Sequence, residues 1–166
     1  MLFRSGISSD LVGLSSAQVG AINTAAVAAL STNQLTSDLS SSFVGLGSAQ
    51  MAALSTAQIG ALTTQQASRL STLQLSGIEA TDAPSLSTQF LSTLSSSQIA
   101  GLSTAAVAAL TSAQLVYGVA TDISGMSSAQ IVALTTSQAA ALTTDQLAAS
   151  LGASSAGMGK IGRAHV

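Results

Sequence analysis

The chain has no cysteine and no tryptophan, and only 2% of its 166 residues are aromatic and 6% charged. Without cysteine, disulfides and thiolate metal sites are excluded. Six acidic residues against four lysines and arginines leave no basic surface for phosphates, so we expect no nucleic-acid partner. Ser, Thr or Gln interrupts every apolar run before the roughly 18 residues that a membrane helix needs, so we expect no membrane span.

Residue types that carry catalysis are also scarce. His165 and Lys160 lie at one end of the chain, so the abundant serines have no histidine or lysine to activate them. Glu79 and Asp82 are the one close carboxylate pair, and they lack partners. No phosphate-binding glycine loop is present. We therefore predict that the protein is not an enzyme and has no catalytic, metal-binding or cofactor-binding residues and no cofactor.

The two ends of the chain differ from everything between them. Residues 1–5 (MLFRS) and 160–166 (KIGRAHV) resemble translations of the two opposite sequencing adapters, in the right orientations. We therefore expect both ends to be artefacts, with residues 6–159 forming a single repeat array cut from a longer gene. In that array Arg69 is the one cation against six acidic residues, which gives a net charge of −5.

An eight-residue repeat fills the array, roughly Leu-[Ser/Thr]-[Ser/Thr]-x-Gln-[Ile/Leu/Met]-x-[Ala/Gly]. It is clearest from Leu46 to Leu75, and the same frame holds from Gly6 to Ser150. We call each repeat an octad and count its positions from the leucine. Since 47% of all residues are apolar and those of the array are evenly spaced, a thin and regularly packed repeat is favoured over a disordered chain.

Within an octad, Ser or Thr at position two is followed three residues later by Gln, which is the spacing of a helix capping box. Ala, a strong helix former, is frequent in the rest of the octad. The pattern predicts one short helix per octad, ended by the next cap. The pairs are Ser15 and Gln18, Ser31 and Gln34, Ser55 and Gln58, Thr63 and Gln66, Ser71 and Gln74, Ser95 and Gln98, Thr111 and Gln114, Ser127 and Gln130, Thr135 and Gln138, and Thr143 and Gln146.

Two simpler conformations fit the octad less well. In one long helix, eight residues overshoot two turns by about 80°, so the leucine column would spiral around the helix and no partner could cover it. In a flat strand, apolar positions one, six and eight do not share one face. A β-solenoid with a bend in each octad escapes this objection and remains the alternative to an all-α solenoid of short capped helices, which we favour.

A longer period is superimposed on the octads. Three irregular octads, Asp38–Gly45, Ile78–Ser85 and Gly118–Gly125, follow one another at intervals of five octads, and Ile22–Leu35 matches Leu102–Leu115 at twice that spacing. Octads nested in a 40-residue super-repeat are typical of a solenoid. Because the irregular octads contain turn-forming residues, we expect the solenoid to change direction there, once per five octads. Phe43, Phe90 and Tyr117 lie at or beside these octads and are expected to fill the corners.

The acidic residues recur with the same period. Asp82 and Asp122 are five octads apart, and Asp10 has the same octad position. Stacked carboxylates would suggest a calcium ladder, but calcium takes six to eight oxygens and each corner offers one carboxylate. We therefore expect these aspartates to make turn or cap hydrogen bonds. The Ser and Thr columns suggest binding to ice or glycans, although hydroxyls that cap helices are already engaged.

The array resembles the octapeptide repeats of very large bacterial surface or secreted proteins of the adhesin-like kind. Residues Leu54–Gln66 (LSTAQIGALTTQQ) and Ala129–Ala149 (AQIVALTTSQAAALTTDQLAA) carry the resemblance. It implies an extracellular or cell-surface location and a role as a structural stalk or spacer, and it transfers no functional residues. The alternative is that the repeat surface binds a ligand such as ice, a glycan or another array. Exposed apolar octads at truncated ends predict self-association.

Overall fold

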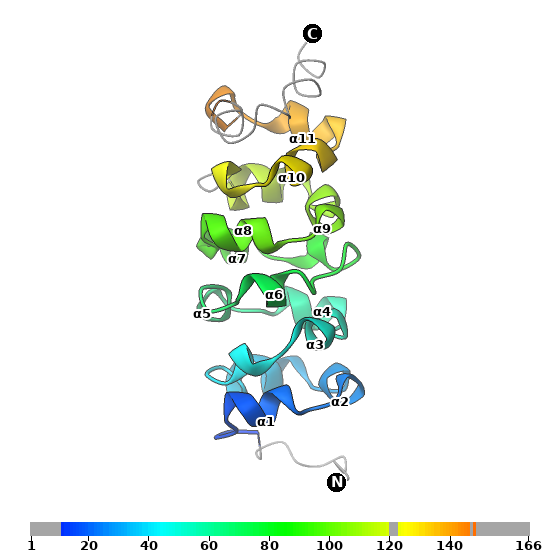
Figure 1. The fold of residues 1–166 in the computed structure, drawn as a ribbon, viewed down its shortest axis with the longest axis vertical. Helices are drawn as coiled ribbons and strands as arrows, with labels where there is room; N and C mark the ends of the chain where they lie inside the picture. Colours follow the sequence, from blue (N-terminus) through cyan, green and yellow to red (C-terminus); the bar gives the residue numbers. More distant parts are fainter. Residues whose placement is uncertain (1–10, 120–122, 147, 149–166) are drawn as a thin grey trace.

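The protein is a stack of short helices wound into one column (Figure 1). The computed structural model describes residues 11–119, 123–146 and 148. No strand occurs in this part of the chain, which confirms the all-α solenoid and excludes the β-solenoid there. The α-helices are α1 Ser16–Gly20, α2 Thr24–Ala28, α3 Ser48–Ala52, α4 Thr56–Gly60, α5 Thr64–Ala67, α6 Thr72–Leu75, α7 Thr88–Thr93, α8 Ser96–Gly101, α9 Thr104–Ala109, α10 Ser128–Ala133 and α11 Thr136–Ala141.

Five further elements of the described residues have other helical geometries. Two are π-helices, η1 Gln34–Asp38 and η4 Gln114–Gly118, and three are 3₁₀-helices, η2 Phe43–Gly45, η3 Ala83–Ser85 and η5 Ile123–Gly125. The adapter-like ends, together with Asp10, Asp122, Lys160 and His165, lie outside the described residues. The predictions about them are not tested by the structure.

Each octad consists of an extended segment followed by a short helix. In α8, Ser95 at the N-cap is extended (φ −72°, ψ 163°), and its hydroxyl accepts from the backbone N–H of Gln98. The helix ends at Leu102, which is extended again (φ −67°, ψ 141°). The chain therefore changes direction at every octad. The predicted direction change once per five octads is wrong, because each cap already interrupts the helix.

The core is built from octad positions one and six. In α4 and its flanks, Leu54 and Ile59 are 3% and 1% exposed, and the Gln58 side chain between them is buried as well. Positions two, three and four face solvent in most octads. Position eight is half-buried in most octads, and its Ala or Gly lies close to the neighbouring turn of the column.

One turn of the column, which we call a coil, takes between three and four octads. Helices pack on helices that lie three octads away along the chain, as α3 does on α6, α6 on α8, and α9 on α10. Glutamine side chains reach carbonyls 28 to 31 residues earlier. The five-octad period is therefore a period of the sequence and not of the coil, and successive irregular octads fall at different places around the column.

The irregular octads are not equivalent in structure. In regular octads the position-one amide bonds the carbonyl three residues back, as Leu62 N does to Ile59 O at 3.2 Å. Leu39 N instead bonds Gln34 O at 3.0 Å, and Val119 N bonds Gln114 O at 3.1 Å, which is the wider π-helical pattern. Each π-helix contains one residue more than the helix of a regular octad. The buried residue that follows it, Leu39 or Val119, is therefore at octad position two instead of position one.

The octad that begins at Ile78 has no such insertion. Ile78 N bonds Leu75 O at 3.1 Å in the regular way, and Ile78 is buried. The next residue, Glu79, is exposed, whereas Leu39 and Val119 at the matching positions are fully buried. Phe43 and Phe90 fill the core as expected of corner plugs. Tyr117 does not, since 74% of its surface is exposed.

Two neighbouring glycines offer a test of how closely the coils approach. A Cβ on Gly45 would lie 2.0 Å from Ser16 O in the coil beneath, whereas one on Gly47 would meet nothing closer than Gln50 Oε1 at 3.7 Å. Gly47 is also the N-cap of α3 and lacks a capping hydroxyl. We expect Gly45→Ser to lower the free energy of unfolding by about 1–3 kcal/mol. Gly47→Ser should raise it by a few tenths of a kcal/mol. Urea denaturation followed by circular dichroism measures both, and equal effects would contradict the close approach at Gly45.

Candidate functional site

All ten predicted capping boxes form. In each, the Gln N–H donates to the Ser or Thr hydroxyl, and Gln Oε1 accepts from the N–H of that residue at 2.7–3.0 Å. The position-two hydroxyls are therefore engaged within their own octads. The hydroxyls that face solvent freely enough to meet a ligand belong mainly to position three, such as Thr64 and Thr136.

The other end of each glutamine side chain links one coil to the next. Gln130 Nε2 donates to Ile99 O at 2.9 Å and to Leu102 O at 2.7 Å, and Gln138 Nε2 donates to Val107 O at 3.0 Å and to Leu110 O at 2.7 Å. The same kind of bond runs back 28 to 31 residues from Gln50, Gln58, Gln66, Gln74, Gln98, Gln114 and Gln146. We call this set of bonds the glutamine ladder.

The ladder explains why amides are tolerated inside the column. Gln130 is 1% exposed, yet its oxygen is bonded to the cap of α10 and its nitrogen to the coil beneath. A buried amide with both ends bonded avoids the cost of an unpaired polar group. Sequence reasoning found the capping half and missed the inter-coil half. The only sequence signal for the latter was the preference for Gln where Glu would cap a helix equally well.

The acidic residues of the sequence are separated in the structure. Asp82 is buried at the position that Gln holds elsewhere, and its Oδ1 accepts from the Thr56 hydroxyl at 2.6 Å. Glu79 is exposed and lies on a shallow surface depression. No group of three or more His, Cys, Asp or Glu side chains in the described residues could hold a metal ion. Asp10 and Asp122, the other members of the suggested calcium ladder, lie outside the described residues.

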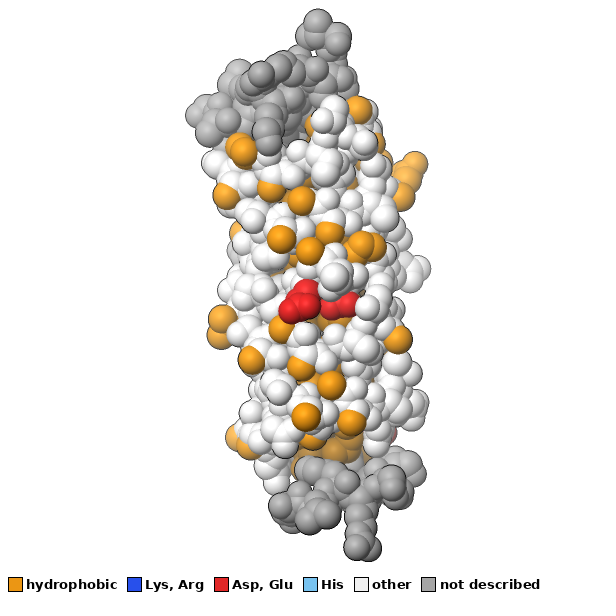
Figure 2. Space-filling model, turned by 90° about the vertical axis from the view of Figure 1, so that its right-hand side faces the viewer, with side chains coloured by type: hydrophobic (Ala, Val, Ile, Leu, Met, Phe, Trp, Pro, Cys, Tyr) orange, Lys and Arg blue, Asp and Glu red, His pale blue; other side chains and the backbone are white. Residues whose placement is uncertain are grey.

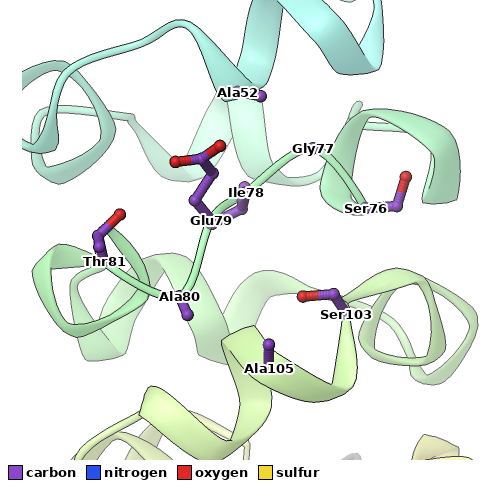
Figure 3. Close-up of a pocket in the computed structure, with 9 residues that line it drawn as sticks. All are labelled: Ala52, Ser76, Gly77, Ile78, Glu79, Ala80, Thr81, Ser103 and Ala105. Carbon is purple, nitrogen blue, oxygen red and sulfur yellow. The ribbon is translucent and has the colours of Figure 1, made fainter.

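The depression has a volume of about 430 Å³ and is open to solvent. Its lining comes from three successive coils: Ala52 on α3, the segment from Ser76 to Thr81, and Ser103 and Ala105 at the start of α9 (Figure 3). Figure 2 shows one acidic patch in the middle of a face that is otherwise polar and apolar, with no basic side chain among its described residues. None of the helices in the described part of the chain has the length and apolar character that crossing a membrane requires.

Two segments, residues 8–41 and 120–149, match the family model described as the ALTTAQ repeat. These two segments are similar to that repeat family. No curated protein and no solved structure matches the chain. The six letters of the repeat correspond to octad position eight followed by positions one to five, as in Ala133–Gln138.

The structure gives each letter of the ALTTAQ repeat a physical role. The first Ala is small where coils approach each other, and the Leu is core. The first Thr caps the helix, and the second Thr and the second Ala face solvent in most octads. The Gln closes the cap and bonds to the coil beneath, as Thr135 and Gln138 do in α11. The octads between the two matched segments follow the same rules, for example Leu62–Gln66.

Proposed function

We propose that this repeat region is a structural spacer of a large bacterial extracellular or cell-surface protein and that it has no catalytic activity. The glutamine ladder is the observation that carries the proposal. It recurs at nine glutamines of the described chain, and every bond joins a coil to the one before it. A column held together in this way lengthens with each added repeat and keeps the same cross-section.

We expect the column to be rigid because each ladder glutamine makes hydrogen bonds within its own octad and to the previous coil. Each ladder glutamine is fixed at one end by its own helix cap and at the other by backbone carbonyls of the previous coil, as Gln130 is. Bending the column would have to stretch inter-coil bonds on one side, and many of these bonds are buried from competing water. The capping hydroxyls are engaged in the same network, which favours a supporting role over a reactive or ligand-binding one for them.

The first test is the shape of the whole chain in solution. Small-angle X-ray scattering should show an elongated particle with a constant cross-section, and a compact globular profile would count against the spacer. Ice-recrystallisation and glycan-array assays address the alternative function. A positive result in either would replace the spacer with a ligand-binding surface, whose hydroxyls would come from octad position three. Antibody labelling of intact source cells tests the surface location, and labelling only after lysis would contradict it.

A further inference from the structure

The surface depression holds an acidic side chain that has no partner among the described residues. Glu79 is exposed there, and its carboxylate makes no ion pair or hydrogen bond with another described residue. The wall around it is formed largely by small residues, among them Ala52, Gly77, Ala80 and Ala105 (Figure 3). An apolar wall beside one negative charge suits a partner that combines an apolar group with a positive charge.

Two exposed side chains of that kind lie close together in the sequence. Leu73 on α6 has 65% of its surface exposed, and Arg69, four residues earlier, is exposed as well. At the octad position of Leu73, the other described octads have Ala or a polar residue. Arg69 is the one cation among the described residues, and its side chain makes no ion pair or hydrogen bond with any of them. We call these two residues the Leu73–Arg69 pair.

The depression and the Leu73–Arg69 pair lie on different faces of the column. In Figure 1, α6 lies at the front of the column. Figure 2 turns the column by 90° and shows the acidic patch in the middle of its face, with no basic side chain among the described residues there. Arg69 therefore does not reach Glu79 of its own chain, and a partner for either charge has to come from another molecule.

We propose that a second copy of this chain inserts its Leu73–Arg69 pair into the depression, so that columns associate side by side. The guanidinium of Arg69 from the second copy pairs with Glu79, and the leucine packs on the alanines of the depression. After one such contact, the first copy still offers its Leu73–Arg69 pair and the second still offers its depression. A contact that uses different surfaces on the two copies does not close at a dimer and continues into lateral arrays.

Sedimentation velocity of the whole chain at micromolar to millimolar concentrations measures this association. We expect the weight-average sedimentation coefficient to rise with concentration without levelling off at a dimer. The rise should shrink in about 1 M NaCl, because salt screens charges beyond about 3 Å. Small-angle X-ray scattering on the same samples should show a growing cross-section at constant length. Growth in length at constant cross-section, or a monomer at every concentration, would overturn the proposal, whereas an elongated monomer would leave the spacer function intact.

Charge reversals test the ion pair. Arg69→Glu and Glu79→Arg should each weaken the association at least about tenfold, since like charges then meet at every contact. An equimolar mixture of the two variants should associate as the parent does, because one chain then carries two acids and the other two cations at the contact positions. If the mixture were as monomeric as the single variants, the pairing of these two residues would be refuted.

Two further variants provide the comparisons. Asp145→Arg changes the net charge as much as Glu79→Arg does, at an exposed position of another coil, and should leave the association within about threefold of the parent. Leu73→Ala should weaken the association about tenfold without lowering the midpoint of thermal unfolding, since the leucine is exposed in the single column. Equal effects of Asp145→Arg and Glu79→Arg would show that only the net charge matters, and would contradict a contact at the depression.

Discussion

Replacing Gln130 by methionine is expected to lower the free energy of unfolding by about 3 kcal/mol or more, although methionine has nearly the same length and shape. The substitution removes the acceptor for Ser127 N–H and the donor to Ile99 O and Leu102 O. Ile99 O keeps its bond from Leu102 N at 3.1 Å, but Ser127 N–H and Leu102 O lose the partner that Gln130 supplies. Each buried group left without a partner costs about 1–3 kcal/mol. Urea denaturation followed by far-UV circular dichroism measures the loss.

Gln65→Met is the matched control. Gln65 lies on α5, one residue before the ladder glutamine Gln66, and is exposed. The same substitution there should change the free energy of unfolding by no more than about 0.5 kcal/mol. If the two variants lost equal stability, the glutamine ladder would contribute nothing beyond helix propensity, and the argument for a rigid spacer would fail with it.

Truncating Phe90 to alanine is expected to cost about 3–5 kcal/mol of unfolding free energy, because the ring is fully buried and its removal leaves a cavity. Phe90 stands where other octads have Gln, and counting back by the spacing of the ladder acceptors leads to Ile59 and Leu62. Phe90→Gln should therefore lose less than Phe90→Ala, since its amide fills part of the space and bonds the carbonyls of these two residues. The same denaturation experiment measures both.

Tyr117→Ala provides the comparison for the loss of an aromatic ring. Tyr117 follows the core residue Leu115 in η4, and 74% of its surface is exposed. Its truncation should stay within about 0.5 kcal/mol of the parent. A Phe90→Gln variant as unstable as Phe90→Ala would show that the ladder geometry is not available at this octad.

The local structure was predictable because its rules act over a few residues. The Ser55 hydroxyl and the Gln58 amide meet within one helical turn whatever surrounds them, so spacing alone places the cap. The same holds for the core, since positions one and six flank each cap. These local rules favoured an all-α solenoid of short helices, and the structure excludes the alternative β-solenoid in the described residues. The prediction that the protein has no catalytic or metal site was an inference from composition, and the structure does not test it.

The course of the coil was not predictable from the same rules. The number of octads in one turn of the column depends on the angle between the helices of successive octads. The octad spacing contains no information about that angle. The expectation of one direction change per five octads failed for this reason. The one-residue insertions at η1 and η4 and the exposure of Tyr117 also depend on which coil lies alongside.

By itself, the sequence determined the octad and its cap and favoured short helices, because these depend on contacts three or four residues apart. It left a bent β-solenoid as the alternative. Only the tertiary structure decided that Gln130 Nε2 meets Ile99 O and Leu102 O. Those bonds join residues in successive coils, far apart along the chain. Their partners exist only once the coils have stacked, and a hydrogen bond forms only where donor and acceptor come within about 3 Å of each other.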